Sequence, residues 1–156
     1  MKSIEILDIV RAIGLVLYFF VAAQGAFYRV GFGKALFDIS PESFIELRKA
    51  VDPRVRRPLK ALYISALATM LTWLVLTVNS GGLLTYGPVL VAFLLLVADL
   101  VLALKCSEPV NVLINADLLN TRQGYVNARD EWMKFIFIRG SFAVAGFVVL
   151  LLYVCL

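Results

Sequence analysis

Residues 83–104 read LLTYGPVLVAFLLLVADLVLAL, and this stretch decides the fold because Asp99 is its one charged side chain. A transmembrane helix needs about 20 predominantly apolar residues, and its backbone polar groups are satisfied within the segment. Three further stretches meet this requirement, at about residues 4–28, 58–78 and 132–156. We therefore predict an all-α integral membrane four-helix bundle that forms a single transmembrane domain over residues 1–156.

The composition of the whole chain agrees with this prediction. It is 62% hydrophobic and 17% charged, whereas soluble domains average roughly 45–50% and about 25%. The formal net charge of +4 is too small and too scattered to indicate a nucleic-acid partner, so we expect the lipid bilayer as the first partner. The chain has no histidine, which removes the commonest metal ligand and general base. We therefore expect neither a metal site nor a cofactor.

The basic residues predict how the bundle lies in the membrane. Most of the 15 Lys and Arg residues flank the first and third connections, which share one side in a four-span protein. The positive-inside rule places that side in the cytoplasm, so the two termini face outward. We expect a multi-pass protein of the prokaryotic cell inner membrane.

A short amphipathic helix is predicted in the first cytoplasmic loop, over about residues 41–51. Ser40 is a suitable N-cap, and a proline suits the first helical position that follows it. The Asp52-Pro53 pair should end this helix, because a proline disfavours helical geometry in the residue before it. The apolar residues of the segment recur on one helical face, at Phe44, Leu47 and Val51.

Two ionisable residues within the apolar spans need an explanation. Asp99 follows the aliphatic run 89–97, and Arg139 lies about 10 Å along the helix axis from the interfacial Trp132. Because the third span ends and the fourth begins on the same side, the two side chains should lie at comparable depth. Either they form the polar floor of an intramembrane pocket, or they are a structural ion pair or snorkelling groups.

The first span carries an unusual stripe of small and polar residues. Arg11, Gly14, Tyr18 and Gly25 lie near one helical face, with Gln24 at its edge. Such a face packs against protein and not against lipid. Close helix packing through the two glycines would explain it, and the alternative is that Arg11, Tyr18 and Gln24 line a pocket.

Two asparagines follow the third span at positions four residues apart. Asn111 and Asn115 therefore share one face of a helix. Asparagine is a poor helix former that needs hydrogen-bond partners. The pair can either bind a polar group of a ligand or cap neighbouring helix ends.

The stretches NVLIN (residues 111–115) and WMKFIFIR (residues 132–139) give the chain a resemblance to a known family. It resembles the anthrone oxygenase-like family of small four-span membrane proteins, most of which have no assigned function. Members typically carry N-x-P-[IL]-N after the third span and W-x-x-W-N-H-x-R at the start of the fourth. The matching positions are Asn111, Asn115, Trp132 and Arg139.

The departures from the family pattern bear on chemistry. Leu113 stands in place of the proline, and Ile136 and Phe137 stand in place of the Asn-His pair. If that pair positions a substrate in the oxygenase members, this protein has lost it. Enzymatic activity is left open, at most as cofactor-independent attack of oxygen on an enolate-like substrate, with Arg139 stabilising the developing negative charge.

The resemblance and the polar residues lead to one main function hypothesis, the binding of a small hydrophobic or quinone-like molecule in an intramembrane pocket. One alternative is a non-enzymatic membrane subunit or assembly partner, in a homo-oligomer or with another membrane protein. A third hypothesis is an oligomeric small transporter that uses Asp99 as its coupling group. The candidate ligand-binding residues are Asn111, Asn115, Arg139, Trp132, Tyr18, Gln24 and Asp99.

Overall fold

The structure of the protein is a computed structural model that describes residues 2–79 and 81–156. Every regular element in these two ranges is helical, which confirms the predicted all-α class. In chain order the elements are α1 (Lys2–Phe27), the π-helical turn η1 (Tyr28–Phe32), α2 (Gly33–Asp38), α3 (Pro41–Val78), α4 (Leu83–Leu102), the π-helical turn η2 (Ala103–Ser107), α5 (Glu108–Asn115) and α6 (Arg122–Cys155). The two π-helical turns join their neighbours without a break, so α1 to α2 and α4 to α5 each form one long helical stretch.

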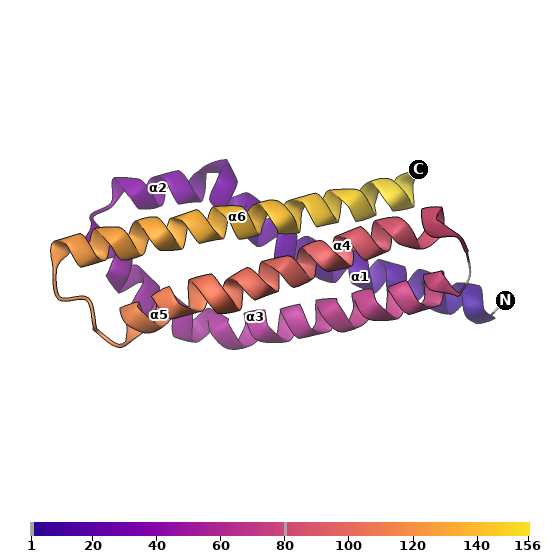
Figure 1. Ribbon diagram of the computed structural model, residues 1–156, viewed down its shortest axis with the longest axis horizontal. Helices are drawn as coiled ribbons and strands as arrows, with labels where there is room; N and C mark the ends of the chain where they lie inside the picture. Colours follow the sequence, from indigo (N-terminus) through magenta and orange to yellow (C-terminus); the bar gives the residue numbers. More distant parts are fainter. Residues whose placement is uncertain (1, 80) are drawn as a thin grey trace.

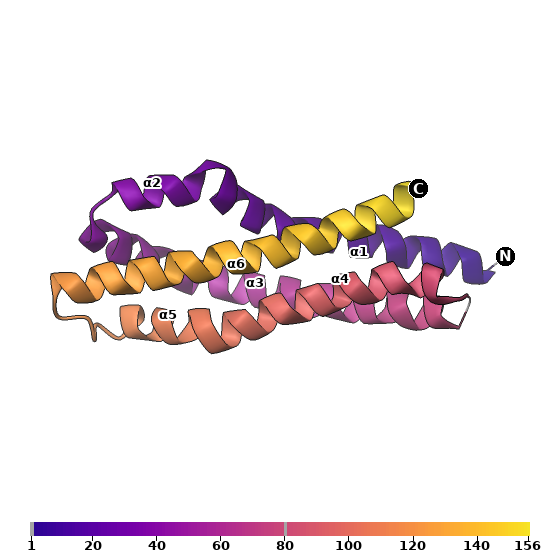
Figure 2. The ribbon, with the colours of Figure 1, turned by 45° about the horizontal axis from the view of Figure 1, so that its top comes forward.

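The long helices lie side by side in an elongated bundle (Figure 1 and Figure 2). The two termini and the α3–α4 connection lie at one end, whereas the α2–α3 and α5–α6 connections lie at the other. The first and third connections therefore share one side, as predicted. The structure has 4 helices that are long and apolar enough to cross a membrane. The chain is thus a multi-pass integral membrane protein with a four-helix bundle fold.

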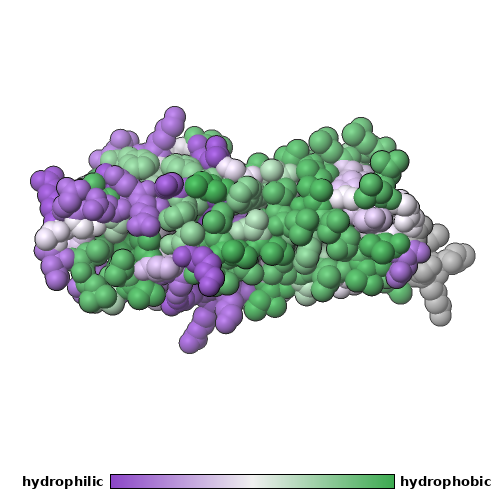
Figure 3. Space-filling model, in the orientation of Figure 1, coloured by the Kyte–Doolittle hydropathy of each residue, from purple (hydrophilic) through white to green (hydrophobic). Residues whose placement is uncertain are grey.

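The helices are longer than a bilayer requires. The α3 helix has 38 residues, or about 57 Å at about 1.5 Å per residue, whereas the hydrocarbon core of a bilayer is about 30 Å thick. Figure 3 shows that hydrophobic residues cover the end of the bundle near the termini, while hydrophilic residues gather at the end that carries α2 and α5. The apolar half has the surface of a membrane span, and the polar half projects beyond it.

Each half of the bundle has its own hydrophobic core. In the apolar half the buried residues include Tyr18, Met70, Trp73, Leu96 and Leu150. In the polar half they include Leu36, Phe44, Ile114, Trp132 and Met133. The second core draws on α2, α3, α5 and α6, so the polar half is packed protein and not a set of loops.

The amphipathic helix predicted over residues 41–51 is present, but its predicted end at Asp52-Pro53 is wrong. Ser40 caps the helix as expected, and its hydroxyl accepts a backbone hydrogen bond at 3.1 Å. The helix then continues as α3 through Pro53 and Pro58 and becomes the second membrane span. A proline inside a helix costs about 3 kcal/mol or more. Tertiary contacts on both sides of the prolines offset that cost, and a sequence pattern does not reveal them.

The fourth long helix begins earlier than the predicted span. It starts at Arg122 and not near Trp132, with the Thr121 hydroxyl as an N-cap that accepts a backbone hydrogen bond at 3.0 Å. The intervening residues are polar, so hydropathy alone excludes them from a membrane span. They are helical because Ala128 and the residues around it pack into the core of the polar half.

The close helix packing predicted through the glycines of α1 is confirmed at Gly25. A Cβ atom added there would lie 2.4 Å from the Cα atom of Gly140. The backbones of α1 and α6 therefore touch at this point. Gly14 instead faces the Trp73 ring of α3, where an added Cβ atom would lie 3.2 Å from a ring carbon.

The backbone contact predicts that Gly25→Ala destabilises the protein. The added methyl group must push α1 and α6 apart, which costs about 1–3 kcal/mol for an overpacked site. The measurement is thermal unfolding of the purified protein in a mild detergent. Gly31→Ala is the matched control, because an added Cβ atom at Gly31 meets nothing within 4 Å, and alanine in a helix is favoured over glycine by about 0.5–1 kcal/mol. Equal stability of the two variants would contradict the contact.

Candidate functional site

A buried ion pair joins α4 and α6 in the middle of the bundle. Asp99 is 1% exposed, and its Oδ1 accepts a hydrogen bond from Arg139 Nε at 2.8 Å. The Asp99 Oδ2 accepts a hydrogen bond from the Tyr63 hydroxyl of α3. The prediction that Asp99 and Arg139 lie at comparable depth is therefore confirmed, and the pair is a structural ion pair.

Arg139 also reaches beyond its carboxylate partner. Its Nη2 donates to the Tyr63 hydroxyl at 3.2 Å, and its Nη1 donates to Ser107 Oγ of η2 at 3.3 Å. A guanidinium has five N–H donors, and these contacts with Asp99 and its neighbours use three of them. Arg139 therefore combines a structural role with free donor capacity.

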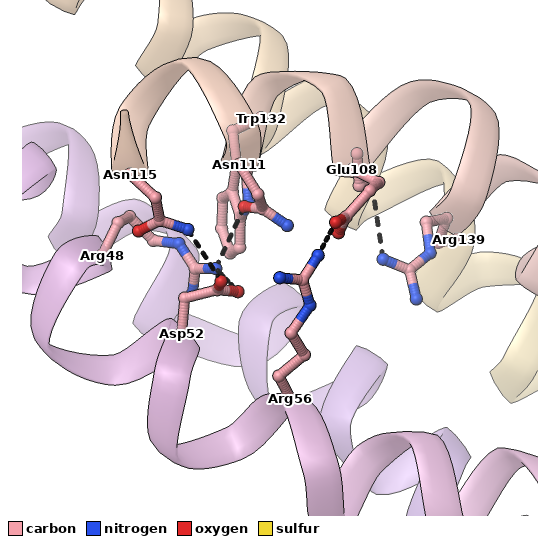
Figure 4. A network of polar contacts seen from close by, with 9 residues as sticks. Arg48, Asp52, Arg56, Glu108, Asn111, Asn115, Trp132 and Arg139 are labelled. Atoms are coloured by element: carbon pink, nitrogen blue, oxygen red, sulfur yellow. Dashed lines mark hydrogen bonds and ion pairs between the residues drawn. The ribbon is translucent and has the colours of Figure 1, made fainter. Parts of the chain in front are cut away.

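A second polar network lies in the projecting half of the bundle (Figure 4). The Oδ1 of Asn111 accepts hydrogen bonds from Trp132 Nε1 at 3.0 Å and from Arg48 Nη2 at 3.2 Å. Arg48 also pairs with Asp52 at 3.1 Å, and Asn115 Nδ2 donates to Asp52 Oδ2 at 2.9 Å. The two asparagines thus cap no helix end, because their side chains bind residues of α3 and α6.

A third polar contact stands between these two groups. Arg56 of α3 forms an ion pair with Glu108 at the start of α5. Figure 4 shows this pair between the Arg48 network on one side and Arg139 on the other. The side chains are 55% and 33% exposed, so this bridge is partly in solvent and is weaker than the buried pair.

The three polar groups surround a cavity of about 680 Å³ between α1, α3, the α4 to α5 stretch and α6. This volume lies within the range of pockets that hold small molecules, roughly 300–1,000 Å³. Its apolar and aromatic wall residues are Phe27, Tyr28, Val51, Val55, Leu59, Tyr63, Ile64, Leu100, Ala103, Leu104, Trp132 and Ile136. Its other wall residues are Gln24, Arg48, Asp52, Arg56, Lys60, Ser107, Glu108, Asn111 and Arg139.

Both π-helical turns contribute to the cavity wall. Tyr28 belongs to η1, and Ala103, Leu104 and Ser107 belong to η2. A π-helical turn carries an extra residue within a helix, which changes the direction of the side chains around it, and such turns are frequent at functional sites. The two places where the helical backbone is irregular therefore both lie at the cavity wall.

The structure gathers some of the predicted ligand-binding residues at this cavity and not others. The four that lie in its wall are Gln24, Asn111, Trp132 and Arg139. Asn115 lies outside the wall and holds Asp52. Asp99 lies behind Arg139, at a small void of about 10 Å³, which has room for about one water molecule.

The candidate residue Tyr18 lies away from the large cavity. Its side chain is fully buried, and its hydroxyl donates to the Ala92 carbonyl at 2.9 Å. A Cβ atom added at Gly146 would lie 1.9 Å from that hydroxyl. Tyr18 therefore ties α1 to α4 and packs against α6, and it does not act as an aromatic wall of the cavity.

Sequence reasoning missed the polar residues that α3 contributes to the site, chiefly Arg48, Asp52 and Arg56. Their segment is rich in basic residues, so single side chains did not stand out. The i, i+4 spacing of Arg48 and Asp52 was an available signal for a helical ion pair. Because a helix end was predicted at Asp52-Pro53, these residues were not expected to lie on the same helix and the same cavity wall as Tyr63.

The two positions where the resembling family has an Asn-His pair differ in their location. Ile136 lies in the cavity wall. Phe137 lies outside the wall and packs against α2, since a Cβ atom added at Gly33 would lie 2.6 Å from the Phe137 ring. Within residues 2–79 and 81–156, no group of three or more His, Cys, Asp or Glu residues is arranged so that it could hold a metal ion.

Comparison of this chain with models of protein families, with curated proteins and with solved structures gives no match.

The buried ion pair predicts strong coupling between Asp99 and Arg139. Asp99→Asn or Arg139→Gln alone leaves one buried charge without its partner, which costs about 3–5 kcal/mol. The double variant removes both charges, so its loss of stability should be well below the sum of the two single losses. The measurement is a double-mutant cycle on the free energy of unfolding in detergent.

The control for this cycle is an exposed ion pair. Asp117 pairs with Lys49 and is 77% exposed, so Asp117→Asn should change stability by less than about 1 kcal/mol. Additive losses for the Asp99 and Arg139 variants would contradict the ion pair.

Proposed function

We propose that this protein binds a small hydrophobic or quinone-like molecule in the cavity between α1, α3, the α4 to α5 stretch and α6. The observation that carries the proposal is the cavity of about 680 Å³, which combines apolar walls with a few convergent polar groups. Binding sites for small molecules have this composition, in which apolar walls supply affinity and polar groups orient the ligand.

Unsatisfied donors in the cavity wall support a ligand with acceptor oxygens. Arg139 lies in the wall and uses three of its five N–H donors in its contacts with Asp99, Tyr63 and Ser107. Asn111 uses only its Oδ1 in the contacts with Trp132 and Arg48, which leaves its amide N–H groups for a ligand. A carbonyl, carboxylate or phosphate oxygen would satisfy these donors.

The link to the anthrone oxygenase-like family belongs to this proposal and rests on four positions. Of these, Asn111, Trp132 and Arg139 lie in the cavity wall, and Asn115 lies one hydrogen bond behind it. We infer binding of a ligand and not a catalytic step. The wall holds no counterpart of the Asn-His pair, since Ile136 is apolar and Phe137 packs elsewhere.

The alternative functions have less support. An assembly partner could have intramembrane polar residues that pair internally or with another chain; Asp99 and Arg139 pair with each other, so this pair calls for no group from another chain. A transporter would need Asp99 to release and take up protons or ions. That carboxylate is held by two donors, from Arg139 and Tyr63, and is 1% exposed.

We propose a cytoplasmic position for the polar half of the bundle, in the inner membrane of a prokaryotic cell. The support is the excess of basic residues around the first and third connections, which the positive-inside rule assigns to the cytoplasm. The cavity would then open at the cytoplasmic level of the membrane.

The binding proposal predicts that filling the cavity expels the ligand. Val55 of α3 lies in the cavity wall, so Val55→Trp should remove most of any small molecule that copurifies with the protein. The measurement is mass spectrometry of an organic extract of the purified protein. Val75→Trp is the matched control, because Val75 is on the same helix, is 52% exposed and lies outside the cavity. Retention of the molecule in Val55→Trp would contradict binding in this cavity.

The orientation predicts which connections are reached from outside the cell. In a variant with Cys106→Ser and Cys155→Ser, a membrane-impermeant maleimide should label Asn79→Cys of the α3–α4 turn in intact cells. Asn120→Cys of the α5–α6 connection should be labelled only after permeabilisation, although both positions are exposed. The reverse pattern would show that the polar half faces outward.

A further inference from the structure

The cavity is elongated along α3. Its wall residues on this helix recur every three or four positions, from Arg48 to Ile64. This stripe spans 16 residue steps, or about 24 Å at about 1.5 Å per residue. On the opposite side the wall runs from Leu100 through η2 to Asn111. A site of this shape fits an extended molecule better than a compact one.

The cavity opens sideways between α3 and the α4 to α5 stretch. Ile64 and Leu104 both line it, yet they are 58% and 60% exposed. Apolar side chains that face the cavity and the outside at once mark a gap in its wall. Leu59 and Leu100 also line the cavity, and all four residues lie within the predicted spans 58–78 and 83–104, so we place the gap toward the acyl chains of the bilayer.

The charges in the wall do not balance. The cations are Arg48, Arg56, Lys60 and Arg139, and the carboxylates are Asp52 and Glu108. Asp99, just behind the wall, neutralises Arg139, which leaves one positive charge without a counterpart. That charge belongs to Lys60, for which the described part of the chain provides no hydrogen bond or ion pair.

Lys60 lies beside the gap, where its positive charge can attract an anionic group of a ligand. Lys60 lies one helical turn from Ile64 on α3, and Arg56 lies one turn further toward the polar half. Charge interactions are strengthened where the dielectric constant is low, as it is beside a bilayer. A cation at the border of the hydrocarbon therefore attracts an anionic group whose attached chain can stay in apolar surroundings.

We propose that the ligand is an anionic single-chain amphiphile that enters from the bilayer between α3 and α4. Its carboxylate or phosphate would lie at Lys60, and its chain would lie along Ile64, Leu100 and Leu104. This inference rests on the proposed function and specifies its ligand class. The volume of about 680 Å³ is in the range of sites for small ligands, which suits one chain.

The test measures binding of two amphiphiles with the same acyl chain to the 156-residue protein in nanodiscs of phosphatidylcholine. Lysophosphatidylglycerol carries an anionic phosphate, whereas monoacylglycerol is neutral. We expect the anionic amphiphile to bind at least about tenfold more tightly, a factor that corresponds to one charge-assisted hydrogen bond. Glycerol phosphate, which has the anionic group without the chain, should not compete at the same concentrations.

The variant Lys60→Gln separates this inference from a general effect of positive charge. It should weaken binding of lysophosphatidylglycerol about tenfold and leave monoacylglycerol binding unchanged. Arg57→Gln is the matched control, because Arg57 is an exposed cation on the same helix and lies outside the cavity. It should change binding of either amphiphile by less than about twofold.

The possible failures are distinguishable. Equal binding of the two amphiphiles, or equal effects of Lys60→Gln and Arg57→Gln, would overturn the anionic ligand class. Competition by glycerol phosphate would indicate a free anion and not a lipid as the ligand. If a neutral hydrophobic molecule still copurifies and is lost in Val55→Trp, the proposed function stands while this inference fails. If nothing occupies the cavity in any variant, both fail.

Discussion

A charge in the hydrocarbon interior must have a partner, and the pairing of Asp99 with Arg139 sets the arrangement of the bundle. The 2.8 Å contact fixes the register of α4 against α6. The Tyr63 hydroxyl joins the same pair and brings α3 to the same level. Between this level and the termini, the helices pack around an apolar core that contains Trp73. Toward the end that carries α2 and α5, polar contacts join the helices, and the cavity lies among these contacts.

The cavity exists because polar contacts hold the helices where apolar side chains do not fill the space. Arg48, Asp52, Asn111 and Asn115 tie α3 to α5 across one end of it. The two π-helical turns flank it, and the second core, around Met133, supports it from the polar side. A network of this kind specifies one arrangement only when all its members are satisfied. The donors that remain free therefore support the proposed ligand.

The part of the site that the sequence predicted consists of residues that contrast with their surroundings. Asn111 and Arg139 are polar groups in or beside apolar segments, where each such group demands a physical reason. Arg48 and Asp52 escaped prediction because they lie in a polar segment, where ionisable residues are ordinary. Tyr18 was correctly placed on the protein-facing side of α1, but its partner is the Ala92 carbonyl and not a ligand.

The sequence by itself determined the all-α class, the number of apolar spans, the shared side of the first and third connections, and the need for a partner at Asp99. Each follows from what the hydrocarbon core of a bilayer requires of a single segment, namely an apolar length that spans it and polar groups that have partners. These requirements can be read from the sequence without knowledge of tertiary contacts. Only the tertiary structure decided that α3 runs through Pro53 and Pro58, and that a cavity lies beside it. These features depend on contacts between distant residues, such as Arg48 with Asn111, which are 63 positions apart. Local patterns carry no information about which distant side chains meet.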